Sequence, residues 1–387
     1  MSEYKVFHLI TRMIRGGADE NTAYTVNGLD KSLFDVDMYA GVESDMDKFN
    51  DLDVKIIPDL IRDVNIVRDF KAFCRLFNVI RKNKYDIVHT HTAKAGILGR
   101  WAAYFNRVPI IIHTLHGATF HESIGSAKKY LYIVLEKMAA SFTDRMISVG
   151  DDLSERYIEK GIGKREKYVT IRSGMKLEKF FKAGELSIRE LETIRDKLDI
   201  RRDRILITQI ARLEERKGYK YLVEASKDII KKTPEALFLI AGEGDYKEQI
   251  QMLIDESKMN DYFRFLGYRE DVEKIIAISD LVVLTSLWEG LPRILVQASA
   301  VGRPVVTFAV EGAREVVKEG INGYVVDIED TSSLAKKVIL ILEDLDKARK
   351  MGIEGRKIIG EEWNVDNMVK KIEALYKELI EKSKKLN

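Results

Sequence analysis

The chain has 387 residues, of which 45% are hydrophobic and 33% are charged, so it is neither a disordered nor a fibrous protein and is long enough for two α/β domains. Its formal net charge of +2 gives no reason to expect a nucleic-acid partner, and its single cysteine excludes an intrachain disulfide. No apolar run reaches the ~18 residues of a membrane-spanning helix. The first residues also lack the long apolar segment and cleavage site of a signal peptide, so we expect a cytoplasmic location.

The first half of the chain alternates short apolar runs with helical patterns. Strands are predicted at residues 6–10, 36–39, 54–57, 86–91, 108–114, 144–149 and 168–171. Helices are predicted at residues 19–29, 62–84, 97–106, 128–142 and 154–160. This alternation is typical of a doubly wound domain with a parallel sheet.

Gly16 and Gly17 lie in the loop between the first strand and the first helix. Two glycines at this point let the backbone approach a ligand closely, although an ordinary flexible turn explains them equally well. The G-x-G-x-x-G fingerprint of dinucleotide-binding proteins is absent here.

The predicted helix at residues 62–84 has two different sides. Its apolar side carries Phe70, Phe73, Phe77 and Ile80, and its basic side carries Arg68, Lys71, Arg75, Arg81 and Lys82. A basic side of this kind is usually just solvated, and the alternative is contact with an anionic membrane surface.

All six histidines lie between residues 8 and 121. Apart from His8, they gather at the ends of the strands at 86–91 and 108–114, and the carboxyl ends of parallel strands form the ligand-binding edge of a sheet. A lone histidine is more often structural, but several at one edge favour a functional role. Zinc is not favoured, because no cysteine accompanies them and His113 is expected to point into the sheet.

The second half of the chain repeats the strand–loop–helix order after a charged connecting segment at residues 176–202. Strands are predicted at residues 205–210, 237–241, 263–266, 281–284, 305–307 and 323–326. A helix is predicted from residue 219, and two helices close the chain, the last at 365–384. We place the domain boundary near residue 173.

Arg212 and Lys217 flank the loop after the strand at 205–210. Two fixed positive charges at the carboxyl end of a strand suit a diphosphate. Lysine and arginine are common in loops, so the pair on its own is weak support for a site.

Residues 285–298 form a second candidate anion site. The apolar run at 281–284 precedes a loop, Pro292 suits a first helical turn, and the helix closes at 302–304. The N-terminus of such a helix offers backbone N–H groups to an anion. Glu289 lies in the loop and Gln297 lies further along the helix. The alternative is an ordinary strand–loop–helix unit without a ligand.

Taken together, these segments resemble a known family. The matching segments are residues 16–18, 86–99, 116–117, 171–175, 211–218, 241–244 and 288–292. In this order and spacing the chain resembles the retaining GT-B glycosyltransferases of the family-4 type. The resemblance implies an α/β fold with two Rossmann-like doubly wound domains that face each other across a cleft. The implied domains are an acceptor-binding domain at 1–172, a nucleotide-sugar-binding domain at 173–364, and a C-terminal helix at 365–387 that packs back on the first domain.

The resemblance also implies roles for individual residues. The implied catalytic residues are His116 and Glu289. Contacts with the donor diphosphate are implied for Arg212, Lys217, Gly290, Leu291, Gly16 and Gly17. Contacts with the nucleoside are implied for Gly242, Gly244, Tyr268, Arg269 and Gln297. The implied acceptor side holds His91, Lys94 and Thr119.

The reaction implied by the resemblance moves a hexose-type sugar from an NDP-sugar to a glycan, lipid-linked or small-molecule acceptor, with retention of configuration. No cofactor or metal is expected, because protein cations neutralise the leaving diphosphate. The resemblance to polysaccharide-assembly enzymes, the basic helix at 62–84 and the apolar helix at 128–142 suit peripheral contact with the inner face of a membrane. The base of the donor stays open.

One position departs from the family pattern. The family has a second glutamate eight residues after the first, and this chain has Gln297 there. A carboxylate can accept from two hydroxyls, whereas an amide offers one acceptor oxygen and two donors. We predict that ribose binding survives in a rearranged form.

Two other functions stay open at this point. One is a sugar-nucleotide epimerase on the same fold, against which the segment at 289–292 with Arg212 and Lys217 argues. The other is a non-catalytic sugar-binding protein, a class that usually carries an export signal.

Overall fold

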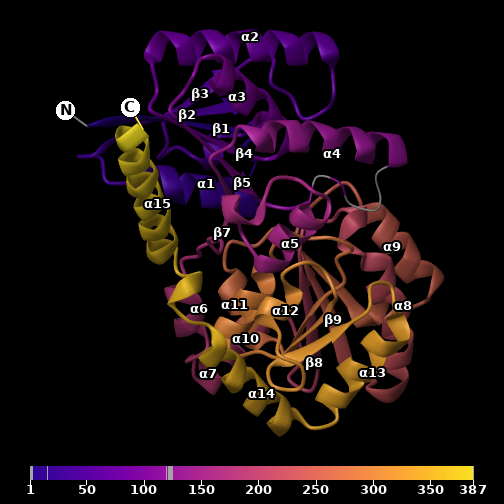
Figure 1. Cartoon of the computed structure of the whole chain (residues 1–387). Helices are drawn as coiled ribbons and strands as arrows, with labels where there is room; N and C mark the ends of the chain where they lie inside the picture. The colour runs from indigo at the N-terminus through magenta and orange to yellow at the C-terminus, as the bar shows by residue number, and fades with distance from the viewer. Residues whose placement is uncertain (1–2, 15, 119, 121–124, 387) are drawn as a thin grey trace. The chain divides into compact units, whose positions relative to one another are not determined.

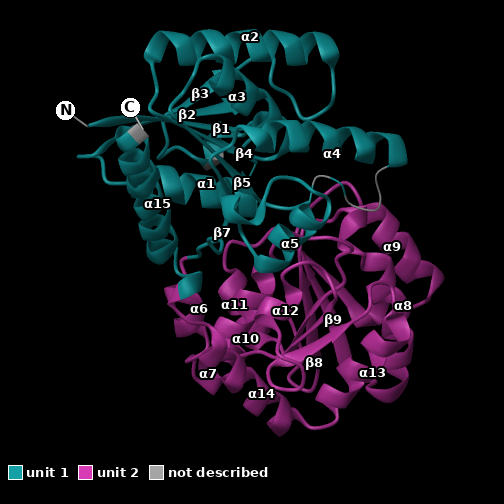
Figure 2. Ribbon diagram, viewed as in Figure 1, with its two compact units in different colours: residues 1–175, 362–387 teal, residues 176–361 magenta. Residues whose placement is uncertain are grey.

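The computed structural model describes residues 3–14, 16–118, 120 and 125–386. The chain divides into two compact units, which Figure 2 colours separately. Unit 1 comprises residues 1–175 and 362–387, and unit 2 comprises residues 176–361.

Unit 1 is built on a seven-stranded parallel sheet with the strand order β3-β2-β1-β4-β5-β6-β7. Its strands are β1 (Tyr4–Ile10), β2 (Phe34–Gly41), β3 (Val54–Ile57), β4 (Ile87–His91), β5 (Ile110–Leu115), β6 (Arg145–Ser148) and β7 (Tyr168–Thr170). The order of the strands reverses between β1 and β4. Such a switch point opens a crevice at the carboxyl ends of the strands, where ligands bind in folds of this kind.

Helices cover both faces of this sheet (Figure 1). They are α1 (Gly17–Gly28), α2 (Ile66–Asn83), α3 (Ala93–Phe105), α4 (Ser126–Ser141), α5 (Asp151–Glu159) and α15 (Val365–Leu386). On one face, Val6 and Ile112 of the sheet pack in one apolar cluster with Ile372 of α15. On the other face, Phe7 packs in a cluster with Leu76 of α2. The last helix of the chain is therefore part of the core of unit 1.

The helix after β4 begins earlier than the sequence predicted. Helix α3 starts at Ala93 instead of residue 97, because Thr92 makes the whole turn with φ 64° and ψ 162°. Positive φ is a rare conformation for a β-branched residue, and here the Thr92 hydroxyl is held 2.8 Å from that of Thr11. Gly96 lies on the face of α3 that meets the sheet, where an added Cβ would come within 2.4 Å of the His113 ring.

Helix α2 is amphipathic, but its buried stripe is narrower than predicted. Ala72, Leu76 and Ile80 are buried, whereas Phe70 is 67% exposed. Phe70 therefore leaves the apolar side on which the sequence placed it and lies on the surface of unit 1.

Unit 2 holds a six-stranded parallel sheet with the order β10-β9-β8-β11-β12-β13. Its strands are β8 (Ile205–Ile210), β9 (Ala236–Ala241), β10 (Phe263–Gly267), β11 (Leu281–Leu284), β12 (Val305–Phe308) and β13 (Gly323–Val326). Its longer helices are α7 (Ile188–Lys197), α8 (Tyr219–Lys232), α9 (Lys247–Glu256), α11 (Arg293–Val301), α13 (Thr331–Leu342) and α14 (Leu345–Ile358). Its shorter helices are α6 (Glu178–Ala183), α10 (Val272–Ile278) and α12 (Ala313–Val316).

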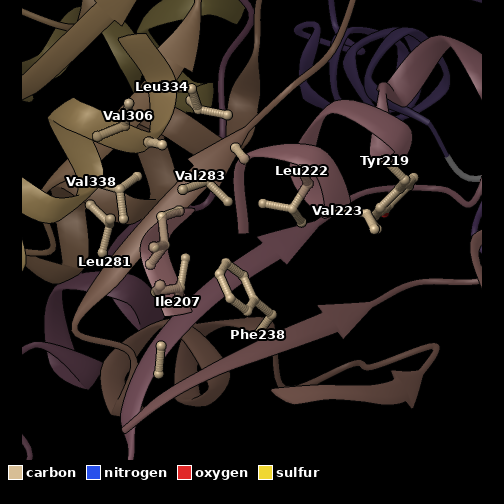
Figure 3. Packing of buried hydrophobic residues seen from close by; sticks show 14 of the residues in the cluster. Ile207, Tyr219, Leu222, Val223, Phe238, Leu281, Val283, Val306, Leu334 and Val338 are labelled. Atoms are coloured by element: carbon tan, nitrogen blue, oxygen red, sulfur yellow. The ribbon is translucent and has the colours of Figure 1, made fainter. Parts of the chain in front are cut away.

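The core of unit 2 lies between this sheet and its covering helices. Figure 3 shows Ile207, Phe238 and Val283 of the sheet beside Leu222 of α8 and Val338 of α13. All of these side chains are buried. Short 3₁₀ turns complete the described elements of the chain, at Met46–Lys48, Arg165–Lys167, Glu215–Lys217, Asn260–Tyr262 and Glu361–Trp363.

Two predictions about helices were wrong. The charged segment at 176–202 is not only a connection, because it contains α6 and α7. Ser187 and Glu190 form a capping box at the start of α7, and this S-x-x-E pattern was the sequence signal for that helix. Three helices, α13, α14 and α15, follow the last strand instead of two.

Among the described residues, no helix combines the length and apolarity needed to cross a membrane.

Candidate active site

In unit 2, the loops after β8 and β11 bring a lysine ammonium group and a glutamate carboxylate together. These two strands are neighbours in the sheet, so their carboxyl ends lie side by side. The ammonium group of Lys217 is hydrogen-bonded to Oε1 of Glu289. The guanidinium of Arg216 lies 3.7 Å from the other carboxylate oxygen of Glu289. The side chains of Lys217 and Glu289 are only 12% and 13% exposed, so the pair is largely shielded from water.

Backbone contacts hold these two loops together. The Leu287 amide donates to the carbonyl of Arg216 at 2.9 Å. The buried Gln209 side chain donates to the Lys217 carbonyl at 3.1 Å, and the Thr285 hydroxyl lies 3.0 Å from the same oxygen. Gly218 ends the first loop at φ 65°, where an added Cβ would lie 1.9 Å from the Thr285 carbonyl oxygen. A glycine is thus required for the close approach that places Lys217 beside Glu289.

Glu214 organises the remaining cations of this edge. Its carboxylate pairs with Arg216 at 2.7 Å and with Arg212 at 3.1 Å. The cations of the network, Arg212, Arg216 and Lys217, outnumber the carboxylates of Glu214 and Glu289 by one. The network therefore holds its basic side chains in place and keeps a net positive charge.

Both carboxylates of the network stay ionised. Burial on its own would raise the pKa of Glu289, but the charges of Lys217 and Arg216 outweigh it and hold that pKa below its ordinary value. Burial also opposes ionisation of Glu214, and the charges of Arg216 and Arg212 again lower its pKa.

Other residues predicted to contact the nucleotide-sugar donor lie along the same edge of unit 2. Gly290 and Leu291 are buried in the loop before α11, and Pro292 caps that helix instead of starting it. Gly242 is braced against the Arg212 loop, because an added Cβ would lie 2.0 Å from the Ala211 carbonyl oxygen.

The predicted nucleoside contacts lie after β9, after β10 and on α11, and they differ in how firmly they are held. Gly244 lies against the Leu213 backbone, where an added Cβ would come within 2.2 Å of its carbonyl oxygen. Tyr268 is 48% exposed. Arg269 makes two hydrogen bonds of 2.8 Å to the carboxylate of Asp271. Gln297 is half-buried on α11.

In unit 1, the candidate site is a cluster of histidines on one face of the sheet. The register pairs His8 with His89 and His91 with Thr114, so their side chains project from the same face. His8 was left outside the cluster by the sequence analysis and in fact belongs to its centre. The missed signal was the alternation along β1, which points His8 to the same face as the histidines of β4.

These side chains are joined by hydrogen bonds. Nδ1 of His8 lies 3.0 Å from Nε2 of His91, and Nδ1 of His91 lies 3.2 Å from Nε2 of His116. The hydroxyl of Tyr376, on α15, lies 3.1 Å from Nε2 of His8 and 2.5 Å from Nδ1 of His89. Nε2 of His89 lies 2.6 Å from the Thr114 hydroxyl. Tyr376 is therefore a member of the cluster that the sequence analysis missed.

Burial keeps this cluster neutral. It lowers the pKa of His116 to about 3, and together with the charge of Lys31 it lowers the pKa of His8 to about 3. Burial and then the neighbouring histidines lower the pKa of His89 and of His91 well below the ordinary value. At neutral pH each ring thus carries one N–H and one bare nitrogen.

The predicted orientation of His113 is confirmed. It projects from the opposite face, where its Nδ1 lies 2.9 Å from the Thr90 hydroxyl. Among the described residues, one group has ligand atoms close enough for a metal ion, namely His8, His89 and His91, within 4.8 Å of one another. Every ring nitrogen of these three already has one of the hydrogen bonds described above.

Two known families match the chain one after the other. Glycosyltransferase Family 4 matches residues 15–179, and Glycosyl transferases group 1 matches residues 190–358. The chain belongs to the family 4 glycosyltransferases. The predicted family and enzyme class are therefore confirmed.

Similar proteins match the glycosyltransferase over nearly its whole length. It is 29% identical to the UDP-Gal:alpha-D-GlcNAc-diphosphoundecaprenol alpha-1,3-galactosyltransferase of Escherichia coli, over 98% of both chains. It is 25% identical to the capsular polysaccharide biosynthesis glycosyltransferase CapM of Staphylococcus aureus, over 99% of both chains. The solved structure of Anabaena Alr3699/HepE in complex with UDP-glucose covers 97% of this chain and 100% of its own, with a TM-score of 0.82 and 20% identity. This likeness confirms the predicted pair of Rossmann-like domains of the GT-B type.

The remaining predicted residues of the glycosyltransferase lie in unit 1. Gly16 caps α1 and Gly17 is its first residue, so the predicted loop is shorter than expected. The ammonium group of Lys94 lies 2.7 Å from the Asp69 carboxylate of α2, in an ion pair that is mostly buried. His91, predicted on the acceptor side, is buried behind His116, and Thr119 lies outside the described residues.

Proposed function

We propose that this glycosyltransferase transfers a hexose from a UDP-sugar to a lipid-linked glycan acceptor, with retention of configuration and without a metal ion. The observation that carries the proposal is the network of Lys217, Arg216 and Arg212 around Glu214 and Glu289. It supplies a preformed, net positive edge in the unit that matches Glycosyl transferases group 1.

In this proposal the cations bind the donor diphosphate. Lys217 and Arg212 contact its oxygens, and the backbone of Gly290 and Leu291 adds N–H groups. As the glycosidic bond to the leaving diphosphate breaks, these charges stabilise the negative charge that develops there. A divalent cation would duplicate this role. Glu289, kept ionised by Lys217, accepts hydrogen bonds from hydroxyls of the donor sugar.

The nucleoside is assigned to the loops beside this network. Gly242, Gly244, Tyr268 and Arg269 contact the base, and Gln297 contacts the ribose. UDP is proposed because the name of the Escherichia coli relative includes UDP-Gal and the HepE structure holds UDP-glucose. In unit 1, His116 serves as the group that meets the reacting sugar, and Gly16 and Gly17 allow backbone contact with the phosphates.

The acceptor is assigned to unit 1, with Lys94 and Thr119 on its side and His91 acting from its buried place behind His116. A surface of this unit supports a lipid-linked acceptor. The first turns of α2 expose Ile66 at 84%, Val67 at 64% and Phe70 at 67%. Apolar side chains of this size on an exposed helix suit insertion at a membrane interface.

Basic side chains lie close to this apolar group in the sequence. Arg62, Arg68 and Lys71 are exposed in the same stretch of the chain. We therefore propose peripheral contact with an anionic membrane surface on the cytoplasmic side, and a role in polysaccharide biosynthesis.

A thermal-shift screen tests the donor assignment. UDP-galactose and UDP-glucose are expected to raise the melting temperature, because a ligand that binds only the native state stabilises it, whereas GDP- and ADP-sugars are not. Stabilisation by GDP- or ADP-sugars alone would contradict the UDP assignment.

A transfer assay tests the reaction itself. The protein is incubated with UDP-galactose and undecaprenyl-diphosphate-linked N-acetylglucosamine, with and without EDTA, and the anomeric configuration of the product is determined by NMR. We expect equal rates in EDTA and an α-linked product. An epimerised UDP-sugar formed without acceptor would replace the proposal by epimerisation, and loss of activity in EDTA would refute its metal-independent part.

A further inference from the structure

The hydrogen bonds of the histidine cluster form one continuous chain. It runs from His116 through His91, His8, Tyr376 and His89 to Thr114. All links lie within unit 1, and every member except His116 is at most 2% exposed. Water is therefore excluded as a substitute partner for the inner members of the chain.

Because the rings are neutral, the protons of this chain are coupled. A neutral imidazole donates from one nitrogen and accepts at the other, and a tyrosine hydroxyl has a single proton to donate. If Tyr376 donates to His89, then His8 must donate to Tyr376, His91 to His8, and His116 to His91. If Tyr376 donates to His8, every one of these bonds reverses. Only these two arrangements give every link a proton and also use the proton of Tyr376 within the chain.

The distances around Tyr376 distinguish the two arrangements. Hydrogen bonds donated by hydroxyl groups are shorter than those donated by N–H groups. The Tyr376 oxygen lies 2.5 Å from Nδ1 of His89 and 3.1 Å from Nε2 of His8. The short contact fits the phenol as donor to His89, and the longer contact fits an N–H of His8 donating to the phenol oxygen.

We propose that Tyr376 and His91 are positioning residues that set the tautomer of His116, with the proton on Nε2 and the lone pair free on Nδ1. The proposal rests on the proposed function only in taking His116 as the group that meets the substrate. Among the described residues no partner is found for Nδ1 of His116, and this side chain is only half-buried. The free lone pair can accept a hydrogen bond from a substrate hydroxyl, whereas the opposite tautomer would present a donor there.

The C-terminal helix is thus linked to the candidate site by hydrogen bonds and does not contact the substrate itself. Tyr376 lies on α15, which closes the chain, and reaches His116 only through His8 and His91. A change on this helix is expected to alter the chemistry of His116 without touching a substrate.

NMR of protein labelled with ¹⁵N in its histidines tests the proposal directly, because protonated and bare ring nitrogens differ in chemical shift. In the wild type we expect a single tautomer of His116 with the proton on Nε2. In Tyr376→Phe, which keeps the ring and removes the hydroxyl, we expect a mixture of both tautomers. A wild-type His116 protonated on Nδ1, or an unchanged single tautomer in Tyr376→Phe, would overturn the proposal.

Variants of His91 separate positioning from packing. In His91→Asn the amide oxygen takes the place of Nδ1, so it still accepts from His116. In His91→Leu that acceptor is lost. We expect His91→Leu to lower kcat by about tenfold or more with little change in KM for the donor, and His91→Asn to restore most of the loss. Equal losses in the two variants would reduce His91 to a packing role.

Other measurements distinguish a failure of the proposed function from a failure of the tautomer proposal. If the wild type transfers no sugar, the proposed function fails, while the tautomer of His116 is still read by NMR. If His116→Ala keeps full transfer, the role of His116 fails whichever tautomer is found. Stoichiometric zinc in the purified protein, lost in His8→Asn, would replace the hydrogen-bonded chain by a metal site.

Discussion

The two units place opposite kinds of chemistry at the same position of the same architecture. At the carboxyl ends of β8 and β11, unit 2 gathers charged side chains and pairs them, as in Lys217 with Glu289. At the carboxyl ends of β1, β4 and β5, unit 1 gathers histidines such as His8 and His91 and keeps them neutral. In both units the position comes from the parallel sheet, and the chemistry comes from the residues at the strand ends.

The difference follows from burial. Charges in unit 2 sit in loops that are partly exposed, with Arg212 still 48% exposed, so their cost of desolvation is limited. The histidines of unit 1 lie on the sheet itself, under α15, where an unpaired charge would be far more costly. A charged edge that suits a phosphate can therefore be built from loops, whereas a fully buried layer of a sheet has to work with neutral hydrogen bonds.

Among its described residues, unit 1 has one ion pair with both side chains fully buried, and breaking this pair should give the largest effect on stability. Arg100 and Glu136 form an ion pair of 2.7 Å whose side chains are both 0% exposed. Arg100→Met leaves the carboxylate of Glu136 buried without its partner, so we expect a loss of about 3–5 kcal/mol in the free energy of unfolding, measured in urea. The double variant Arg100→Met/Glu136→Leu should recover most of that loss. A single variant that loses less than about 1 kcal/mol would mean that the pair is hydrated.

Removing the central cation of unit 2 should affect activity more than stability. We expect Lys217→Ala to lower kcat/KM by a factor of about 10² to 10³, because one fixed charge at the leaving diphosphate is lost. The thermal shift by UDP should fall with it. Lys227→Ala is the matched control, because Lys227 is 43% exposed on α8 and pairs with Glu224 one turn away. Full activity in Lys217→Ala would place the diphosphate elsewhere.

The neutral histidines should make the protein sensitive to acid. In the unfolded chain they protonate as the pH falls below about 6.5, whereas the native pKa of His8 and of His116 is about 3. Between these values the unfolded state binds more protons, so stability is fully present above pH 6.5 and is lost as the pH falls. Each buried histidine should contribute about 1.4 kcal/mol per pH unit near pH 5, measured as the free energy of unfolding in urea from pH 7 to 5.

A variant that lacks one buried histidine provides the control for the loss of stability at low pH. Burial and then the charge of Arg100 lower the pKa of His113 well below the ordinary value. His113→Asn should therefore reduce the slope of stability against pH by the share of a single histidine, even if the variant is less stable at pH 7. An unchanged slope would show that His113 is protonated in the native state.

The smallest effect is expected at Gln297. We expect Gln297→Ala to weaken donor binding by about fivefold, the loss of one hydrogen bond of about 1 kcal/mol, and Gln297→Glu to keep it. Titration calorimetry with UDP measures both. Unchanged affinity in Gln297→Ala, or abolished binding in Gln297→Glu, would remove Gln297 from the ribose site.

Local patterns predicted much of the fold. The strands Val54–Ile57, Ile205–Ile210, Leu281–Leu284 and Gly323–Val326 were predicted at their observed bounds. Leu281–Leu284 is the clearest case, because it is fully buried and forms a short continuous apolar run between turn residues. Helix α11 ends at Val301 with Gly302 at φ 87°, as the pattern Gly-Arg-Pro predicted. Helices α6 and α7 were missed because charged residues dominate their segment.

The sequence by itself determined which residues stand at the strand ends: Arg212 and Lys217 after one strand, Glu289 after another, and His116 after a third. These assignments need only strand periodicity and the rule that parallel strands end at one edge. Tertiary structure decided the partners. That Lys217 binds Glu289, that His8 belongs with His91, and that Tyr376 from the last helix joins them depends on strand register and on long-range packing. Hydrogen bonds act over about 3 Å, and no local pattern brings groups that are 72, 83 or 368 residues apart to that distance.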